Sequence, residues 1–210
     1  KGEETLEADI VLSAVGIKTN IENIGLEDLG IKTDKDKILV NDFYQTNVSG
    51  IYAIGDVVAG PALAHVASAE GILCVEKIKG MDVEPLDYGN IPGCTYTTPE
   101  IASVGLTENE ASKKGYKLKV GTFPFSGLGK ALADGNRDGF VKVIYDQEYG
   151  ELLGCHIIGS EATELIQELV LAKNLEDTWE NLAYTMHPHP TLSEAIMEAA
   201  MDAYGSGVHQ

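Results

Sequence analysis

The sequence predicts an α+β fold, in which antiparallel strands carry helices gathered on one side. Two apolar runs, at residues 140–145 and 152–158, flank a short polar segment and predict a β-hairpin. Residues 161–173 then place apolar side chains at the spacing of one helix face, namely Leu165, Ile166, Leu169 and Val170. Together these patterns indicate a sheet covered by helices.

The elements around this hairpin follow from local signals. Thr107 and Glu110 form a capping-box pattern, which predicts a helix from 108 to about 114. Further strands are expected at 95–104, interrupted by Pro99, and at 117–125, and further helices at 179–184 and 192–204. Residues 81–93 are rich in Pro and Gly and predict a linker. We therefore place a domain boundary near Tyr88, with domains at 1–88 and 89–210.

The first domain combines short strands with one clear helix. Strands are expected at 10–15, 37–43 and 51–54, and a helix at 62–79 after Pro61. A strand as apolar as 10–15 requires neighbours on both faces. Because no residues precede it to supply them, we interpret the chain as part of a longer protein.

Composition limits the classes of function. The 33 acidic and 15 basic residues give a formal net charge of −18, which disfavours nucleic-acid binding. The acidity favours solubility, or alternatively a patch for a basic partner protein. No apolar run approaches about 20 residues, and no signal peptide is visible, so no membrane association is expected. Three cysteines without Cys-x-x-Cys spacing indicate reduced thiols of a cytoplasmic protein.

One candidate binding segment lies around the end of the strand at 51–54. Gly55 would allow a ligand to approach the backbone, and the Asp56 carboxylate could accept hydrogen bonds from a cofactor's hydroxyl groups. Alternatively, Asp56 caps the next turn. Leu63, Ala64 and His65 begin the following helix, where free amides favour an electron-rich group. Alternatively, His65 is a polar surface or cap residue.

A second candidate segment, HPHPTLSE, begins at His187. The prolines stiffen the loop around His189. Glu194 could bond one nitrogen of the His189 ring, fix its tautomer and leave the other nitrogen to move a proton. Two alternatives stay open: Glu194 could complete a capping box with Thr191, and the two histidines could bind a metal.

Several motifs together resemble the pyridine nucleotide-disulfide oxidoreductases, and they cover nearly the whole chain. The sequence TNVSGIYAIGDV, from residue 46, is similar to the family's second flavin fingerprint, and LAHVASAEG, from 63, to its flavin-contacting helix start. YTTPEIASVGLTE, FPF and GCHIIG resemble parts of the family's dimerisation domain, and HPHPTLSEA resembles its end. The resemblance implies that residues 1–88 are a remnant of the FAD/NAD(P)-binding α/β domains and that 89–210 form the dimerisation domain.

The HPHPTLSE segment most resembles the dihydrolipoamide dehydrogenase branch of this family, with glutathione reductase as the alternative. The resemblance implies FAD and NAD as cofactors, a homodimer, and a lipoyl-bearing protein of a 2-oxo acid dehydrogenase or glycine cleavage complex as partner. His189 would be the acid/base that takes a proton from the dihydrolipoyl thiol, and Glu194 would orient it across the dimer interface. Gly55, Asp56, Leu63, Ala64 and His65 would lie at the flavin, and the His189–Pro190 bond would be cis.

The chain also departs from the family pattern. It lacks the Gly-x-Gly-x-x-Gly turns for flavin and NAD and the redox-active Cys pair. We therefore expect these 210 residues alone to be inactive and to bind neither cofactor tightly. A rival interpretation is a stand-alone dimerisation or interaction module without redox activity.

Overall fold

The structure is a computed structural model that describes residues 4–209. The chain divides into two compact units between Leu86 and Asp87. The predicted linker and the predicted boundary at Tyr88 lie in this part of the chain.

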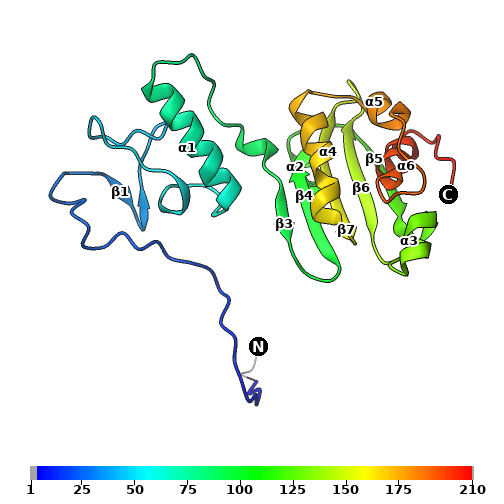
Figure 1. Cartoon of the computed structure of the whole chain (residues 1–210), viewed down its shortest axis with the longest axis horizontal. Coiled ribbons are helices and arrows are strands. Elements are labelled where there is room, and N and C mark those ends of the chain that lie inside the picture. The colour runs from blue at the N-terminus through cyan, green and yellow to red at the C-terminus, as the bar shows by residue number, and fades with distance from the viewer. Residues whose placement is uncertain (1–3, 210) are drawn as a thin grey trace. The chain divides into compact units, whose positions relative to one another are not determined.

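The second unit is built on a five-stranded antiparallel sheet with the strand order β3-β4-β7-β6-β5 (Figure 1). Its strands are β3 (Gly93–Thr95), β4 (Glu100–Gly105), β5 (Leu118–Pro124), β6 (Phe140–Asp146) and β7 (Leu152–Gly159). The predicted β6–β7 hairpin is confirmed. The expected strand at 95–104 is split into β3 and β4, and the Thr98–Pro99 bond between them is cis.

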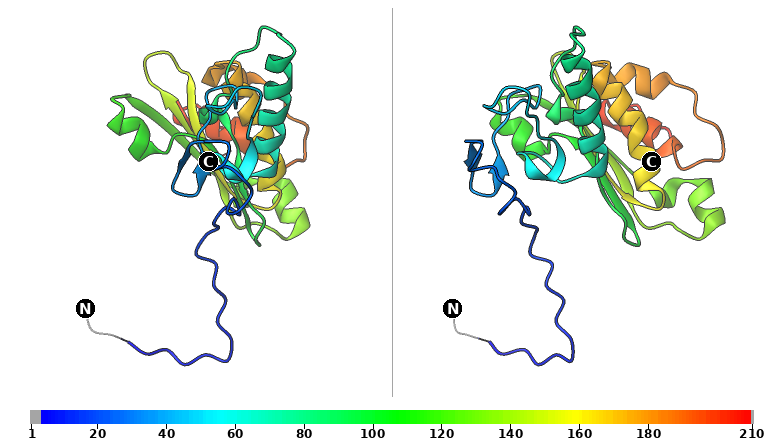
Figure 2. Two further views of the ribbon diagram at one scale, coloured as in Figure 1. Left: turned by 90° about the vertical axis from the view of Figure 1, so that its left-hand side faces the viewer. Right: turned by 60° about the vertical axis from the view of Figure 1, so that its left-hand side comes forward.

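Helices pack on both faces of this sheet but cover them unequally (Figures 1 and 2). The helices are α2 (Glu108–Lys113), α3 (Gly129–Asp134), α4 (Ala162–Asn174), α5 (Trp179–Tyr184) and α6 (Glu194–Ala203). The main core joins α4 and α6 to one face through residues such as Val143, Ile166 and Ala199. The α2 helix covers part of the opposite face, where Ile144 packs under Ala111. The capping box of Thr107 and Glu110 at α2 is confirmed.

Helix α6 lies directly on β5. A Cβ atom added to Gly121 would stand 1.9 Å from the carbonyl oxygen of Ala199, so only glycine permits this approach. Asp202, near the end of α6, also accepts a hydrogen bond from the amide of Thr122 at 2.8 Å. The middle and the end of α6, the helix that begins with Glu194, are therefore held against β5.

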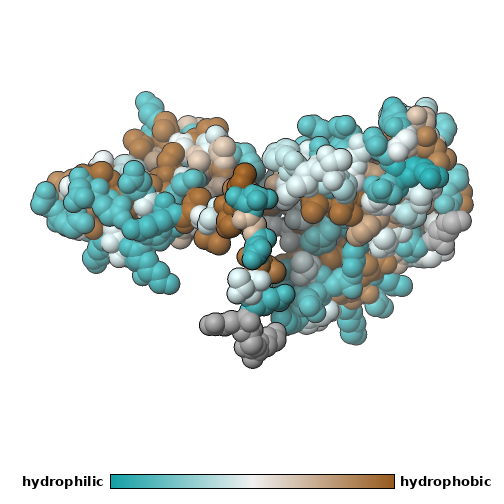
Figure 3. All heavy atoms as spheres, turned by 90° about the horizontal axis from the view of Figure 1, so that it is seen from below, coloured by the Kyte–Doolittle hydropathy of each residue, from teal (hydrophilic) through white to brown (hydrophobic). Residues whose placement is uncertain are grey.

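The first unit contains the predicted helix as α1 (Ala64–Ile78) and the short 3-10 helix η1 (Gly55–Val57). The rest is mainly loop, with a small ladder of β1 (Thr33–Asp34) and β2 (Lys37–Ile38). Ile72, Val75 and Ile78 of α1 are exposed. Figure 3 shows apolar residues among the polar ones on the face of the unit that it draws.

Of the three strands predicted in this unit, one is absent and two are much shorter than expected. Residues 10–15 form no strand, and Ile10 and Val15 are 87% and 96% exposed. The strand at 37–43 shrinks to β2, and that at 51–54 to a single bridge between Tyr52 and Gln45. A strand forms only against a partner, and the described residues offer no pairing to residues 10–15 and only short pairings to the other two segments. No helix of the described residues is long and apolar enough to cross a membrane.

Candidate functional site

The two histidines of the HPHPTLSE segment lie in the loop between α5 and α6. The His189–Pro190 bond is cis, as predicted. His189 points outward, with 75% of its side chain exposed, whereas the side chain of His187 is only 4% exposed. Two histidines separated by one proline therefore meet opposite environments.

Glu194 holds the exposed ring of His189. Its Oε1 lies 2.9 Å from His189 Nδ1, and its Oε2 accepts a hydrogen bond from the amide of Thr191 at 2.9 Å. In the neutral ring this bond keeps the proton on Nδ1, so Nε2 is the exposed nitrogen that carries no proton. Burial alone would raise the pKa of Glu194, but the bonds from the Thr191 amide and from His189 hold it below its usual range.

Of the capping box predicted for Thr191 and Glu194, only the bond made by the Glu194 side chain is present. Glu194 does bond the Thr191 amide, but the Thr191 hydroxyl donates to the carbonyl of Pro188 at 2.7 Å instead of capping α6. The α6 helix begins after Ser193, which makes no side-chain cap bond. One carboxylate therefore serves both the loop backbone and the imidazole.

A second acid–histidine pair lies one helical turn further along α6. Glu198 is 1% exposed and accepts hydrogen bonds from the amides of Val208 and His209 at 3.1 and 3.3 Å. The His209 ring also bonds this carboxylate. With His189 and Glu194, this pair lines a small cavity of about 100 Å³. Glu198 was not predicted from the sequence, although its spacing of four residues from Glu194 places both on one helix face.

His187, for which the sequence predicts no chemistry, bonds through both ring nitrogens. Nε2 lies 2.9 Å from Oε1 of Glu168 on α4, and Nδ1 lies 2.9 Å from the carbonyl oxygen of Thr185. A carboxylate and a carbonyl only accept hydrogen bonds, so both nitrogens carry protons and the ring is an imidazolium. The bond to Glu168 raises the pKa of His187 above its usual range.

This raised pKa makes part of the stability depend on pH. When the pKa of a histidine is higher in the folded chain than in the unfolded chain, its protonation adds to the free energy of unfolding. This contribution is complete at pH values below the unfolded pKa of about 6.5, and it is lost as the pH rises through the folded pKa. We predict that the free energy of unfolding lost in Glu168→Gln is largest near pH 6 and shrinks at higher pH. Urea unfolding followed by the fluorescence of the single Trp179, which stacks on Tyr204, measures it. Glu164→Gln, on the same helix, is the control; a pH-independent loss would contradict the prediction.

The predicted flavin-side residues lie in the first unit. Gly55 has a φ of +72°, and its amide donates to Oε2 of Glu70 at 2.6 Å. Glu70 is only 2% exposed on the inner face of α1, with Val66 and Leu73 one turn to either side. Glu70 was not predicted from the sequence, although a carboxylate among apolar residues at helical spacing can indicate a buried polar contact. Glu70 fixes the turn that presents Asp56.

The side chain of Asp56 is exposed beside this turn. Neither η1 nor α1 has a side-chain cap bond at its N-cap residue, Ile54 or Leu63, so neither helix shows the capping alternative for Asp56. Ala64 and His65 form the exposed first turn of α1. The structure therefore brings these residues to one end of α1, and their role stays a prediction.

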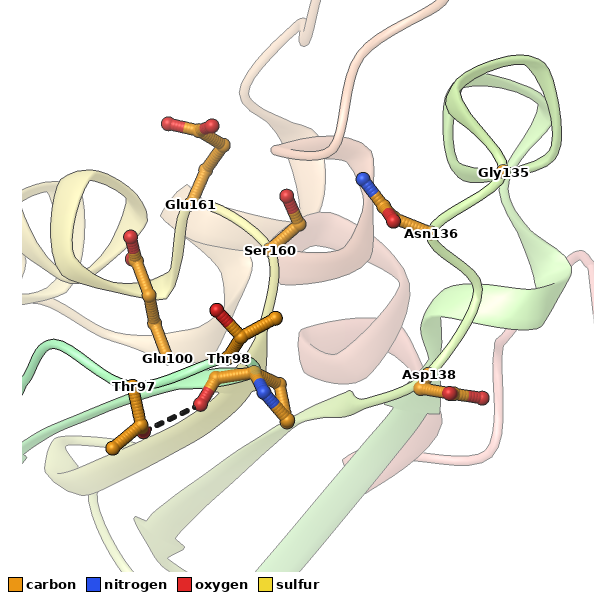
Figure 4. Close-up of a pocket in the computed structure, with 9 residues that line it drawn as sticks. Thr97, Thr98, Glu100, Gly135, Asn136, Asp138, Ser160 and Glu161 are labelled. Atoms are coloured by element: carbon orange, nitrogen blue, oxygen red, sulfur yellow. Dashed lines mark hydrogen bonds between the residues drawn. The ribbon is translucent and has the colours of Figure 1, made fainter.

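A larger cavity, of about 210 Å³, lies among three loops of the second unit and contains none of the predicted residues (Figure 4). Carboxylates of Glu100, Asp138 and Glu161 line it with Asn136. Glu100 is already bonded by the amide and hydroxyl of Thr163 at 2.9 and 2.8 Å. Nowhere in residues 4–209 do three or more His, Cys, Asp or Glu side chains gather as a metal site.

The three cysteines are free thiols, as predicted. Cys74 and Cys155 are buried, and Cys94 is partly buried. Burial raises the pKa of each thiol, so none of them is activated as a thiolate.

Two family models match the chain. The dimerisation domain of the pyridine nucleotide-disulphide oxidoreductases matches residues 91–200, and the pyridine nucleotide-disulphide oxidoreductase model matches residues 1–71. The first match covers most of the second unit, and the second covers most of the first unit.

Curated relatives carry the name dihydrolipoyl dehydrogenase. The chain is 54% identical over 203 residues to that of Rhizobium etli and 51% identical over 197 residues to that of Zymomonas mobilis. These alignments cover 96% and 93% of this chain but only 42% of each relative. Among solved structures, LpdA from Mycobacterium tuberculosis superposes with a TM-score of 0.84 at 29% identity, covering 89% of this chain and 41% of that one.

Proposed function

The chain belongs to the pyridine nucleotide-disulphide oxidoreductase family, and on this premise we propose that it is the C-terminal part of a dihydrolipoamide dehydrogenase. The whole protein would oxidise protein-bound dihydrolipoamide with NAD as acceptor. The observation that carries the proposal is the 2.9 Å contact between Nδ1 of His189 and Glu194, in a chain that is 54% identical to a curated dihydrolipoyl dehydrogenase.

His189 would act as the base in this reaction. Its exposed Nε2 takes the proton of a dihydrolipoyl thiol, so that the thiolate can attack the enzyme's disulfide. Glu194, held by the Thr191 amide, stabilises the imidazolium that forms and keeps the ring oriented. The prolines on both sides of His189 limit the motion of the backbone that carries it.

The first unit fits a flavin at its exposed turn. The positive φ of Gly55 and the Glu70 bond hold a tight turn, Asp56 offers a carboxylate to ribityl hydroxyl groups, and α1 begins with exposed residues. When bound there, FAD would carry electrons from the disulfide to NAD. In this assignment residues 1–88 complete the FAD-binding domain beside the last edge of the NAD-binding domain, and 89–210 form the dimerisation domain.

We expect the second unit to form a homodimer in which His189 and Glu194 reach the disulfide of the partner subunit. The 75% exposure of the His189 side chain and the match to a dimerisation domain support this arrangement. Sedimentation of the 210-residue chain at micromolar concentration should give a dimer of about twice its 22.5 kDa mass. A monomer at that concentration would contradict it.

The substrate is tested with the full-length protein. We expect NAD reduction with dihydrolipoamide, or with a lipoyl-bearing protein of a 2-oxo acid dehydrogenase or glycine cleavage complex, and none with reduced glutathione. Activity with reduced or oxidised glutathione, and none with dihydrolipoamide, would favour the glutathione reductase alternative. A dimer that oxidises neither dihydrolipoamide nor reduced glutathione would favour the interaction module.

A further inference from the structure

The position of the exposed His189 ring depends on the loop that carries it. Nine residues, 185–193, connect Tyr184 at the end of α5 to Glu194 at the start of α6. In the described chain the His189 ring bonds only Glu194, and three quarters of its side chain faces solvent. Side-chain packing therefore contributes little, and the loop backbone must place the ring.

Hydrogen bonds hold this loop to two helices of the second unit, one on each side of His189. On one side of His189, the amide of Thr191 bonds Glu194 of α6. On the other side, His187 reaches Glu168 of α4 at 2.9 Å with only 4% of its side chain exposed. The bond from the Thr191 hydroxyl to the Pro188 carbonyl closes the segment between the two anchors.

The α4 anchor is rigid. Ile166 and Leu169, on either side of Glu168 in sequence, are 1% and 0% exposed in the main core. The second ring nitrogen of His187 bonds the carbonyl of Thr185, so the ring cannot turn without breaking one of its two bonds. Because the His187 side chain is buried and both of its ring nitrogens are bonded, it restrains the backbone that carries His189.

We infer that His187 and Glu168 are positioning residues for the reaction: their contact ties the loop to α4 and holds His189 where it accepts the substrate proton. This inference rests on the proposed function of His189. The titratable groups whose charges reach His187 are Glu168 from α4 and Glu194 from α6. Loss of the tether would let the His189 ring move, and small displacements of a catalytic group lower the rate strongly.

The test uses the full-length protein and compares two reactions. Glu168→Ala should lower kcat for dihydrolipoamide oxidation by about tenfold or more, because the proton acceptor is displaced. The reduction of an artificial acceptor by NADH, which does not need His189, should stay within about twofold of wild type. Glu168→Gln should recover most of the lost kcat, since its amide can bond a neutral His187 ring at Nε2.

The controls separate positioning from general damage. Glu164→Ala removes an exposed carboxylate from the same helix and should change kcat by less than about twofold. In the Glu168→Ala background, His187→Ala should lower kcat little further, because the contact between the two side chains is already lost. The inference is overturned if Glu168→Ala keeps wild-type kcat, if both reactions fall equally, or if Gln fails to restore the rate. If His189→Gln also keeps its dihydrolipoamide activity, the proposed function itself fails.

Discussion

Replacing His189 with Gln in the full-length protein should slow dihydrolipoamide oxidation by roughly 10²–10⁴-fold, the range typical of removing a general base. The amide of Gln can bond Glu194 but cannot take the thiol proton at neutral pH. The loss should appear in kcat and in kcat/KM alike, because the interaction is made in the transition state. Steady-state NAD reduction with dihydrolipoamide measures it.

A second reaction tests whether His189→Gln acts on proton transfer alone. The oxidation of NADH by an artificial acceptor bypasses the dithiol step and should survive. His156→Gln is a matched control, because within residues 4–209 this ring in β7 bonds only the Leu106 carbonyl, to which an amide can still donate. Equal loss of both reactions in His189→Gln, or an equal effect of His156→Gln, would count against His189 as the base.

Local signals predicted the second unit well. The capping box placed α2, the hairpin pattern placed β6 and β7, and the apolar stripe placed α4. Each of these signals lies within a few residues of the element that it predicts. The strands predicted in the first unit are absent or shorter than expected, because strand pairing depends on partners distant in sequence. The apolar segment 10–15 carries no information on whether such a partner exists.

The contact between His189 and Glu194 was predicted from the sequence, but the buried residues that hold the surrounding loops were not. The loop motif identified His189 and Glu194, and the structure places them 2.9 Å apart. The opposite environments of His187 and His189 depend on α4, whose Glu168 lies 19 residues before His187. Glu70 and Glu198 are both buried carboxylates on apolar helix faces, and each holds backbone amides of another segment. Such supports are hard to predict because their partners are loops without a sequence pattern.

The other large effect is expected for Glu194. Glu194→Gln should lower kcat for dihydrolipoamide oxidation by roughly 10–10²-fold, because the neutral amide still accepts the Nδ1 proton but no longer stabilises the imidazolium. Glu194→Ala should be slower again, since the ring also loses its orientation.

Comparison of the two reactions separates a role of Glu194 in catalysis from a role in capping the loop. The pKa of Glu194 lies below its usual range, so its carboxylate is ionised throughout the neutral range. Its contribution is lost only as the pH falls through that lowered value. The loss of rate in Glu194→Gln should therefore be present throughout the range of about pH 6 to 9. If Glu194 only capped the loop, Gln and Ala would reduce the thermal stability of the chain and both reactions together. A selective loss of dithiol oxidation, with NADH oxidation intact, requires that the carboxylate act on His189.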